Sequence, residues 1–218
     1  MKAKYRDALP QLDGAFLLTD GGLETDLIFH YGFELPEFAS FPLLETDAGQ
    51  AELARYYDEY VQIARHSGPG LLLEAMTWRA NPEWGVRLGY TRDQLDEINR
   101  TAIAFLEQVR DNAHDLAPVV ISGNIGPRGD GYVVGDIMDA SAAQRYHARQ
   151  VEVFADTAAD LVSAFTMTYA DEAIGIVRAA RAAAMPVVIS FTLETDGRLP
   201  SGQSLGDAIS HVDSDTDG

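Results

Sequence analysis

The sequence predicts an α/β protein built on a parallel sheet of repeated βα units, and three observations support this fold class. Short apolar runs rich in leucine, valine and isoleucine alternate with longer stretches of helical periodicity, which is typical of strands buried on both faces and of their connecting helices. Pro118 and Pro186 stand directly before two of these runs, where a helix cannot continue. Polar residues follow every run, as they do at the carboxyl ends of parallel strands.

The apolar runs are four or five residues long, and each is a predicted strand. They are Phe16–Thr19, Leu71–Ala75, Val119–Gly123, Leu161–Phe165 and Val187–Phe191. The longer segments have the periodicity of helices, and they span Ala48–His66, Arg92–Ala113, Ser141–Ala158 and Ala170–Ala184. Thr91 with Gln94 predicts a capping box before the second helix, and Asp139 or Ser141 is expected to cap the third.

Two parallel architectures are compatible with this pattern, an open doubly wound sheet and a (β/α)₈ barrel. The glycines do not follow the G-x-G-x-x-G nucleotide pattern, and "TDGGLETD" has no P-loop lysine. A barrel would need about 250 residues, whereas this chain has 218 residues and only five visible units. No linker or low-complexity segment divides the chain, so we expect residues 1–218 to form one domain.

The composition excludes several classes of partner. With 16 basic and 34 acidic residues, the net charge is −18, so the field of the protein would repel nucleic acid and anionic membranes. No run approaches the roughly 20 apolar residues of a membrane span, and the N-terminus lacks the apolar centre of a signal peptide. We therefore expect a cytoplasmic protein. The chain has no cysteine, which removes disulfides and thiolate metal ligands.

Five segments carry motifs that are informative together: "TDGGLETDL", "LLLEAMTWRAN", "ISGNIGPRGDGY", "YHARQVEVFADTAADLVSAFTMTYADEA" and "DGRLPSGQSLGDAI". In order and spacing they resemble the homocysteine S-methyltransferase family, from about residue 14 onward. The resemblance implies a (β/α)₈ barrel of the TIM type, of which residues 1–218 would be the N-terminal two-thirds. It also implies transfer of a methyl group from a small-molecule donor to the thiol of homocysteine. In the family, zinc held by three cysteines binds this thiol and activates it as a nucleophile.

The resemblance suggests that the first strand end holds the amino-acid end of homocysteine. There Asp20 can accept hydrogen bonds from an ammonium group, and two glycines permit a close approach of the ligand to the backbone. Alternatively, Asp20 only caps the turn and the glycines only supply positive φ. The candidate substrate-binding residues are Asp20, Gly21, Gly22, Glu74, Thr77 and Asn124.

Two aromatic residues are candidates for the methyl-donor side. Trp78 and Tyr169 could flank a sulfonium or quaternary ammonium donor, because such cations are attracted to ring faces. Alternatively, Trp78 packs against the following helix.

The chain departs from the family pattern in its metal ligands. The family's cysteines are absent, and the five histidines are scattered along the chain without the spacing of a helical zinc site. Most of them are expected on helix surfaces or in loops: His30, His66, His114, His147 and His211. We therefore expect this chain to bind no zinc tightly, to be inactive alone, and to be a truncated barrel.

A second departure concerns the acceptor. Phe165 stands where many members carry a glutamate that helps hold the ammonium of the substrate. Either Glu74 compensates from the neighbouring strand, or the acceptor is another small thiol or selenol. A third hypothesis is a catalytically dead relative that binds a small amino acid or serves in assembly.

The barrel hypothesis also predicts how the strands are arranged. The five strands should lie in sequential order, with a helix after each. The edges of the first and last strands would be exposed, so we expect either a homo-oligomer or coverage of these edges by a terminal segment.

Overall fold

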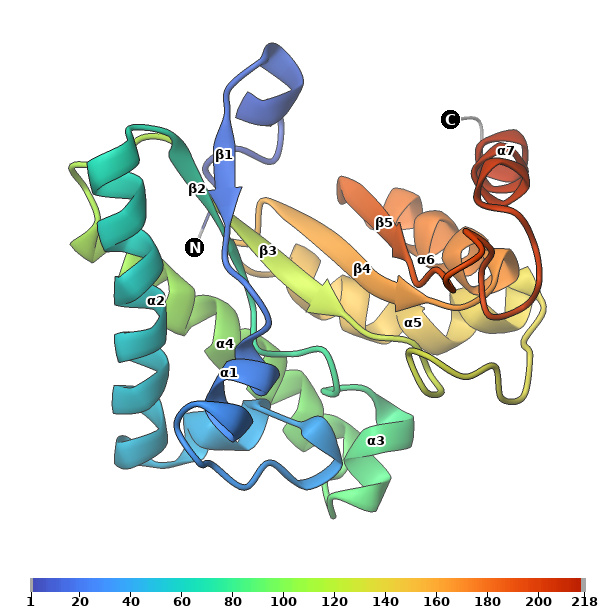
Figure 1. Cartoon of the computed structure of the whole chain (residues 1–218), viewed down its shortest axis with the longest axis horizontal. Helices are drawn as coiled ribbons and strands as arrows, with labels where there is room; N and C mark the ends of the chain where they lie inside the picture. The colour runs from blue at the N-terminus through green and yellow to red at the C-terminus, as the bar shows by residue number, and fades with distance from the viewer. Residues whose placement is uncertain (1, 217–218) are drawn as a thin grey trace.

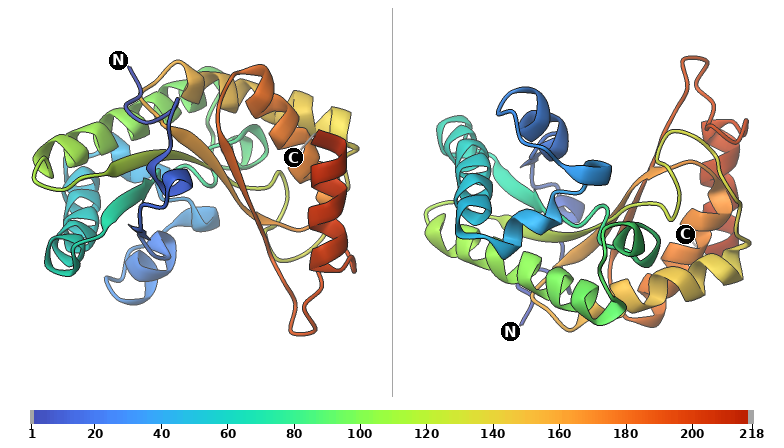
Figure 2. Two further views of the ribbon diagram at one scale, coloured as in Figure 1. Left: turned by 90° about the horizontal axis from the view of Figure 1, so that it is seen from above. Right: turned by 90° about the horizontal axis from the view of Figure 1, so that it is seen from below.

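The sheet of the computed structural model, which describes residues 2–216, has five parallel strands in the order β1-β2-β3-β4-β5. Their bounds are β1 Leu17–Thr19, β2 Gly70–Glu74, β3 Val119–Ile125, β4 Leu161–Met167 and β5 Val187–Phe191. The predicted sequential order is confirmed, and it excludes the doubly wound alternative, in which the order reverses. The sheet curls into part of a barrel, with the long helices on its outer side (Figures 1 and 2).

The helices follow the strands along the chain as a βα pattern requires. They are α1 Leu23–Phe29, α2 Asp47–Ser67, α3 Pro82–Arg87, α4 Arg92–Asn112, α5 Ala140–Ala155, α6 Ala170–Ala182 and α7 Leu205–Thr216. Three short 3-10 turns, Pro10–Asp13, Pro36–Phe38 and Phe41–Glu45, precede α1 or lie between α1 and α2. The predicted capping box of Thr91 and Gln94 is present at α4, and Asp139 caps α5 by accepting the N–H of Ala142.

Several element bounds differ from those predicted. Phe16 is exposed, and β1 begins after it. Both β3 and β4 run two residues beyond their apolar runs, because their backbones remain paired after the side chains become polar. As a result, Asn124 lies within β3. Helix α5 ends three residues early, where the hydroxyl of Thr157 turns back to the carbonyl of Phe154 at 2.6 Å. The short helix α3 was not predicted.

The two faces of the sheet have different partners. Leu71 and Leu73 of β2 belong to the large core cluster between the sheet and the helices, whereas Leu72 faces the barrel interior, as the two-residue period of a strand requires. There it packs with Leu9 and with residues of β3 and β4. The N-terminal segment is fixed at this end, because Asp160 Oδ1 accepts the backbone N–H of Tyr5 at 2.7 Å.

The interior of the barrel changes character along the strands. At the amino ends its residues are apolar, such as Leu72 and Val120. Two residues further along, β2 carries Glu74 and β3 carries Ser122, which are paired in register. This polar end is where the substrate-binding residues were predicted. No helix between residues 2 and 216 is long and apolar enough to cross a membrane.

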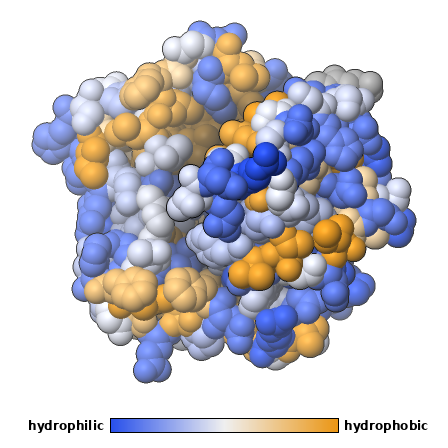
Figure 3. Space-filling model, turned by 45° about the vertical axis from the view of Figure 1, so that its right-hand side comes forward, coloured by the Kyte–Doolittle hydropathy of each residue, from blue (hydrophilic) through white to orange (hydrophobic). Residues whose placement is uncertain are grey.

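An apolar groove lies beside the last strand. It has a volume of about 460 Å³ and is lined by residues of β5, α6 and α7, among them Ile189 and Ile209. Strand β5 is paired only with β4. Figure 3 looks onto the side where β5 and α7 lie, and apolar side chains are exposed there among hydrophilic ones.

Candidate functional site

A cavity of about 680 Å³ lies at the carboxyl ends of the strands. The loop after β1, the ends of β2, β3 and β4, and the loop of residues 126–139 all contribute to its wall. Five of the six predicted substrate-binding residues line it: Asp20, Gly21, Gly22, Glu74 and Asn124. The sixth, Thr77, is fully buried outside the lining, and its hydroxyl donates to the carbonyl of Asn124 at 2.7 Å.

Asp20 is fixed by groups from two other elements. Its Oδ1 accepts the backbone N–H of Glu74 at 3.3 Å, and its Oδ2 accepts the hydroxyl of Tyr56 on α2 at 3.3 Å. Burial raises the pKa of Asp20 well above its usual value, and the nearby charge of Glu74 raises it further. Helix α1 has no side-chain cap, so Asp20 does not cap this helix.

Glu74 is buried, with 8% of its surface exposed. Ser163 donates to its Oε1 at 2.8 Å and in turn contacts the hydroxyl of Ser122 at 2.8 Å. Its Oε2 has no hydrogen-bond partner among the described residues. Burial raises the pKa of Glu74 to about 7. An unpartnered buried acceptor is costly, so this carboxyl group is suited to receive a donor from a ligand.

The glycines after Asp20 form one wall of the cavity. A Cβ on Gly21 would lie 2.5 Å from the hydroxyl oxygen of Tyr60, so the backbone can pass here only without a side chain. Gly22 has a φ of −81°, and Gly21 is not among the glycines of positive φ. The alternative that these glycines supply positive φ is therefore wrong, and close packing is the reason for Gly21.

The end of β4 carries local strain at the cavity wall. Phe165 lines the cavity together with Thr166, whose φ of 59° lies in the left-handed region, where β-branched residues are rare. The hydroxyl of Thr166 accepts the indole N–H of Trp78 at 3.1 Å. Gly131 packs against both side chains, since a Cβ there would lie 2.7 Å from Oγ1 of Thr166. Strain of this kind is often found at functional sites.

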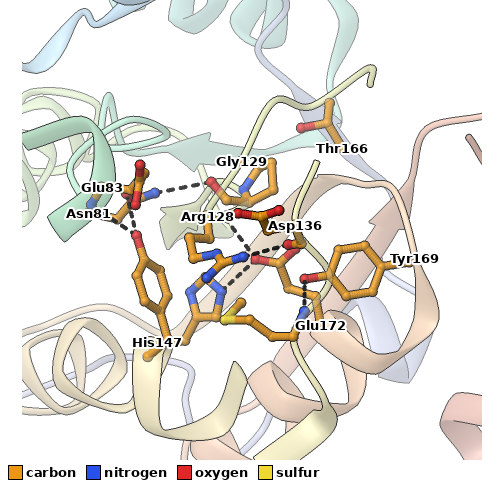
Figure 4. A network of polar contacts seen from close by, with 12 residues as sticks. Asn81, Glu83, Arg128, Gly129, Asp136, His147, Thr166, Tyr169 and Glu172 are labelled. Atoms are coloured by element: carbon orange, nitrogen blue, oxygen red, sulfur yellow. Dashed lines mark hydrogen bonds and ion pairs between the residues drawn. The ribbon is translucent and has the colours of Figure 1, made fainter. Parts of the chain in front are cut away.

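The two aromatic residues considered for the donor side are separated. Trp78 lines the cavity, whereas Tyr169 does not. Tyr169 directly precedes α6, and its hydroxyl accepts the backbone N–H of Met138 at 3.2 Å, so its ring faces the loop of residues 126–139 instead of the cavity (Figure 4). The expectation that Tyr169 flanks a ligand beside Trp78 is wrong.

The same loop is held by a buried contact between a histidine and a glutamate. His147 Nε2 and Glu172 Oε1 lie 3.0 Å apart, and Glu172 also accepts the backbone N–H of Arg128 at 2.7 Å (Figure 4). Burial would raise the pKa of Glu172, but the contacts with His147, Arg128 and Tyr169 together outweigh it, and the pKa lies below its usual value. His147 is thus a buried residue of α5, whereas His30, His66 and His114 are exposed.

The described residues do not fit the zinc that the family resemblance implies. In residues 2–216, no three histidine, cysteine, aspartate or glutamate side chains gather in a way that would hold a metal ion. The sequence also lacks the cysteines from which such a site would be built.

Sequence reasoning missed several groups that complete the site. Tyr56 comes from the middle of a long helix, and Ser163 from the centre of a strand that was recognised only as apolar. Arg79 belongs to the motif "LLLEAMTWRAN" and was not singled out, yet it lines the cavity, and its guanidinium lies between aromatic side chains. No sequence signal distinguishes Tyr56 from its neighbours in "RYYDEY".

Comparisons with known proteins agree with the geometry. A family model described as homocysteine S-methyltransferase matches residues 17–217. Crystal structures of the homocysteine methyltransferase MmuM from Escherichia coli have a similar fold. The oxidized form has a TM-score of 0.74 at 22% identity, over 94% of this chain and 71% of that chain.

Two further forms of the same enzyme were found. The metallated form has a TM-score of 0.74 at 19% identity, over 94% of this chain and 73% of that chain. The apo form has a TM-score of 0.66 at 21% identity, over 91% and 68%. No curated protein matches the sequence.

Proposed function

Because the chain belongs to the homocysteine S-methyltransferase family, we propose that its cavity binds the amino-acid end of homocysteine, or of a related small thiol or selenol. In the complete reaction this thiol or selenol would accept a methyl group from a small-molecule donor. Acceptor binding is the part of that function for which residues 2–216 provide the groups.

The observation that carries the proposal is the pair of carboxyl groups at the ends of β1 and β2. Asp20 and Glu74 line one cavity, and Glu74 Oε2 has no partner among the described residues. An ammonium group has three donors and one positive charge, so it would satisfy Glu74 and relieve the mutual repulsion of the two carboxylates. Hydrogen bonds of this charge-assisted kind are the strong ones.

The cavity also accounts for the departure at the end of β4. In this proposal Glu74 supplies from β2 the carboxylate that the family resemblance puts at position 165. The ring of Phe165, which lines the cavity, would then contact the methylene groups of the ligand. The acceptor can therefore remain an amino acid although the family glutamate is absent.

A second candidate function is amino-acid binding without catalysis. It is favoured by the lack of a metal-ligand set in residues 2–216. Both candidates share the acceptor pocket, so binding is tested first and methyl transfer second.

The binding test is a calorimetric titration of homocysteine into the wild-type protein and the Asp20→Asn variant. The amide keeps the size of the side chain but loses the charge-assisted bond, which is worth about 1.5–3 kcal/mol, so the affinity should fall about 10- to 100-fold. Asp26→Asn is the control, because Asp26 lies on α1 outside the cavity lining and contacts His30. Equal affinity of all three proteins would refute the proposed pocket.

Methyl transfer is tested by supplying the same protein with homocysteine, a sulfonium methyl donor and zinc, and measuring methionine by mass spectrometry. Turnover that Asp20→Asn slows and Asp26→Asn leaves unchanged would support the methyltransferase. Binding without any turnover would limit the function of this chain to acceptor binding.

A further inference from the structure

Arg79 is a buried cation without an ionic partner. Only 5% of its surface is exposed. Its Nη1 donates to the backbone carbonyl of Gly129 at 3.1 Å, and its Nε has no hydrogen-bond partner in the described part of the chain. No carboxylate of residues 2–216 forms an ion pair with it. Burying an unpaired charge is costly, so a group that is absent from the chain itself is the natural partner.

The charge of Arg79 persists at neutral pH. Burial lowers its pKa, while the more distant carboxylates of Asp130, Glu24 and Glu37 raise it, and the balance is a pKa of about 10. These acidic residues compensate the charge only at a distance, since none of them reaches ion-pair range. The guanidinium is therefore protonated and still has N–H donors free, because only one of its five donors has a protein acceptor among the described residues.

Two indole rings fix the guanidinium in place. Its central carbon lies 3.8 Å from the ring centroid of Trp78 and 3.6 Å from that of Trp84. Stacking of this kind uses the face of the guanidinium and leaves its N–H groups available. Arg79 and Trp78 both line the 680 Å³ cavity. A preoriented guanidinium at a cavity wall is the arrangement that binds a carboxylate with two parallel hydrogen bonds.

We propose that Arg79 is the anion-binding group of this cavity and receives a ligand carboxylate. The cavity then has two poles, an acidic one at Asp20 and Glu74 and a cationic one at Arg79, and it selects zwitterionic ligands. The inference rests on the proposed function for the ammonium end only. The carboxylate belongs either to the acceptor amino acid or to a zwitterionic methyl donor, and the experiment distinguishes these two sources.

The test compares wild-type protein with Arg79→Met, in which an unbranched apolar side chain still fills the space between the indoles. Arg87→Met is the matched control, because Arg87 lies 4.4 Å from the ring centroid of the same Trp84 but does not line the cavity. The probes are two pairs that differ by a carboxylate. Homocysteine is paired with 3-aminopropane-1-thiol, and dimethylsulfoniopropionate is paired with ethyldimethylsulfonium.

If the acceptor supplies the carboxylate, Arg79→Met weakens homocysteine binding about tenfold or more and changes 3-aminopropane-1-thiol binding less than about twofold. If the donor supplies it, the same loss appears for dimethylsulfoniopropionate and not for ethyldimethylsulfonium. Either result supports the proposal. Unchanged affinity for all four probes overturns it, as does a wild-type protein that binds neither zwitterion.

The wild-type protein provides a measurement that does not depend on folding of the variant. It should bind the zwitterion of at least one pair about tenfold more tightly than the partner without a carboxylate, and equal affinities within both pairs would overturn the proposal. The ammonium site and the Arg79 site can be tested separately. Asp20→Asn should weaken the binding of homocysteine and of 3-aminopropane-1-thiol alike, whereas Arg79→Met should leave the binding of 3-aminopropane-1-thiol unchanged.

Discussion

At the scale of single residues, the site depends on where a carboxyl group is placed inside a barrel. Glu74 lies on the interior face of β2, beyond the apolar layer of Leu72. Its neighbours Ser163 and Ser122 supply hydroxyl groups but no positive charge. The folded protein therefore favours the protonated form of Glu74, and its stability should depend on this proton.

Glu74→Gln tests this dependence. The pKa of Glu74 is about 7 in the folded protein and 4.5 in the reference state, so between these values the folded state holds a proton that the unfolded state has released. The free energy of unfolding should thus fall as the pH rises from about 4.5 to 7. Glutamine does not ionise, so the free energy of unfolding of the variant should not decrease in this way. At pH 8 the variant should therefore be more stable than the wild type by about 3 kcal/mol.

The measurement is urea unfolding at pH 5 and pH 8. Glu97→Gln is the control, because Glu97 is an exposed residue of α4. The same pH dependence in wild type and in both variants would contradict the burial of an unpaired Glu74.

Gly131 tests the close packing at the strained end of β4. A Cβ on Gly131 would lie 2.7 Å from Oγ1 of Thr166 and 3.0 Å from the ring of Trp78. Gly131→Ala should therefore displace the loop, lower stability by about 1–3 kcal/mol and weaken homocysteine binding. Gly135→Ala, four residues along the same loop, has no atom within 4 Å of the new Cβ and should change stability by less than about 0.5 kcal/mol. Equal unfolding midpoints for the two variants would count against the packing described.

At the scale of elements, the loop of residues 126–139 connects the cavity to the helix layer. Its first part is fixed by Glu172, which accepts the backbone N–H of Arg128, and its last part by Tyr169, which accepts that of Met138. Between these points the loop contributes Asp130 and Tyr132 to the cavity. Helix α6 and the residue before it therefore determine where one wall of the cavity lies.

Glu172→Ala tests this connection. Removing Glu172 leaves the buried His147 Nε2 and the backbone N–H of Arg128 without their partner, so the free energy of unfolding should fall by about 1–3 kcal/mol for each group left unsatisfied. The amide of Arg128 should also exchange its hydrogen faster, because its acceptor is lost. Glu152→Ala on the exposed face of α5 is the control and should alter neither quantity. Unchanged exchange at Arg128 in the Glu172 variant would show that the loop is held by other contacts.

The sequence was most informative about features that depend on local pattern. The strands, their sequential order and the caps of α4 and α5 were predictable, because apolar runs, helical periodicity and capping residues act over a few neighbouring positions. Asn124 was expected in a loop because its side chain is polar, although its backbone is still paired with β4.

The parts of the site that depend on distant contacts were not predictable. The position of the Arg79 guanidinium depends on Trp84 and on the carbonyl of Gly129. Both belong to other segments of the chain. The orientation of Tyr169 depends on the backbone of Met138 in the same way. The motifs indicated which strand ends carry the candidate site, but the role of each residue depends on the three-dimensional arrangement.

At the scale of the whole molecule, the curled sheet has two outer strands, β1 and β5, and each is paired on one side only. Next to β5, the apolar groove with α7 exposes residues such as Ile209, which is 46% exposed. Unpaired strands and exposed apolar surface favour association with another chain. Self-association through this side stays a prediction.

Sedimentation equilibrium tests it with Ile209→Glu. The wild-type protein should show a concentration-dependent apparent mass, and the new charge in the groove should shift it toward the monomer. Leu12→Glu is the control, because Leu12 is 80% exposed in the N-terminal segment and lies outside the groove. A wild-type protein that is monomeric at every concentration would contradict the prediction.

The central claim is that the cavity recognises the ammonium group of a small thiol amino acid through Asp20 and Glu74. The most direct measurement is the affinity of the wild-type protein for homocysteine and for 4-mercaptobutyrate, which has the same thiol and carboxylate but no ammonium group. Loss of the charge-assisted hydrogen bonds should make 4-mercaptobutyrate bind about 10- to 100-fold more weakly. Equal affinity for the two compounds would contradict the account.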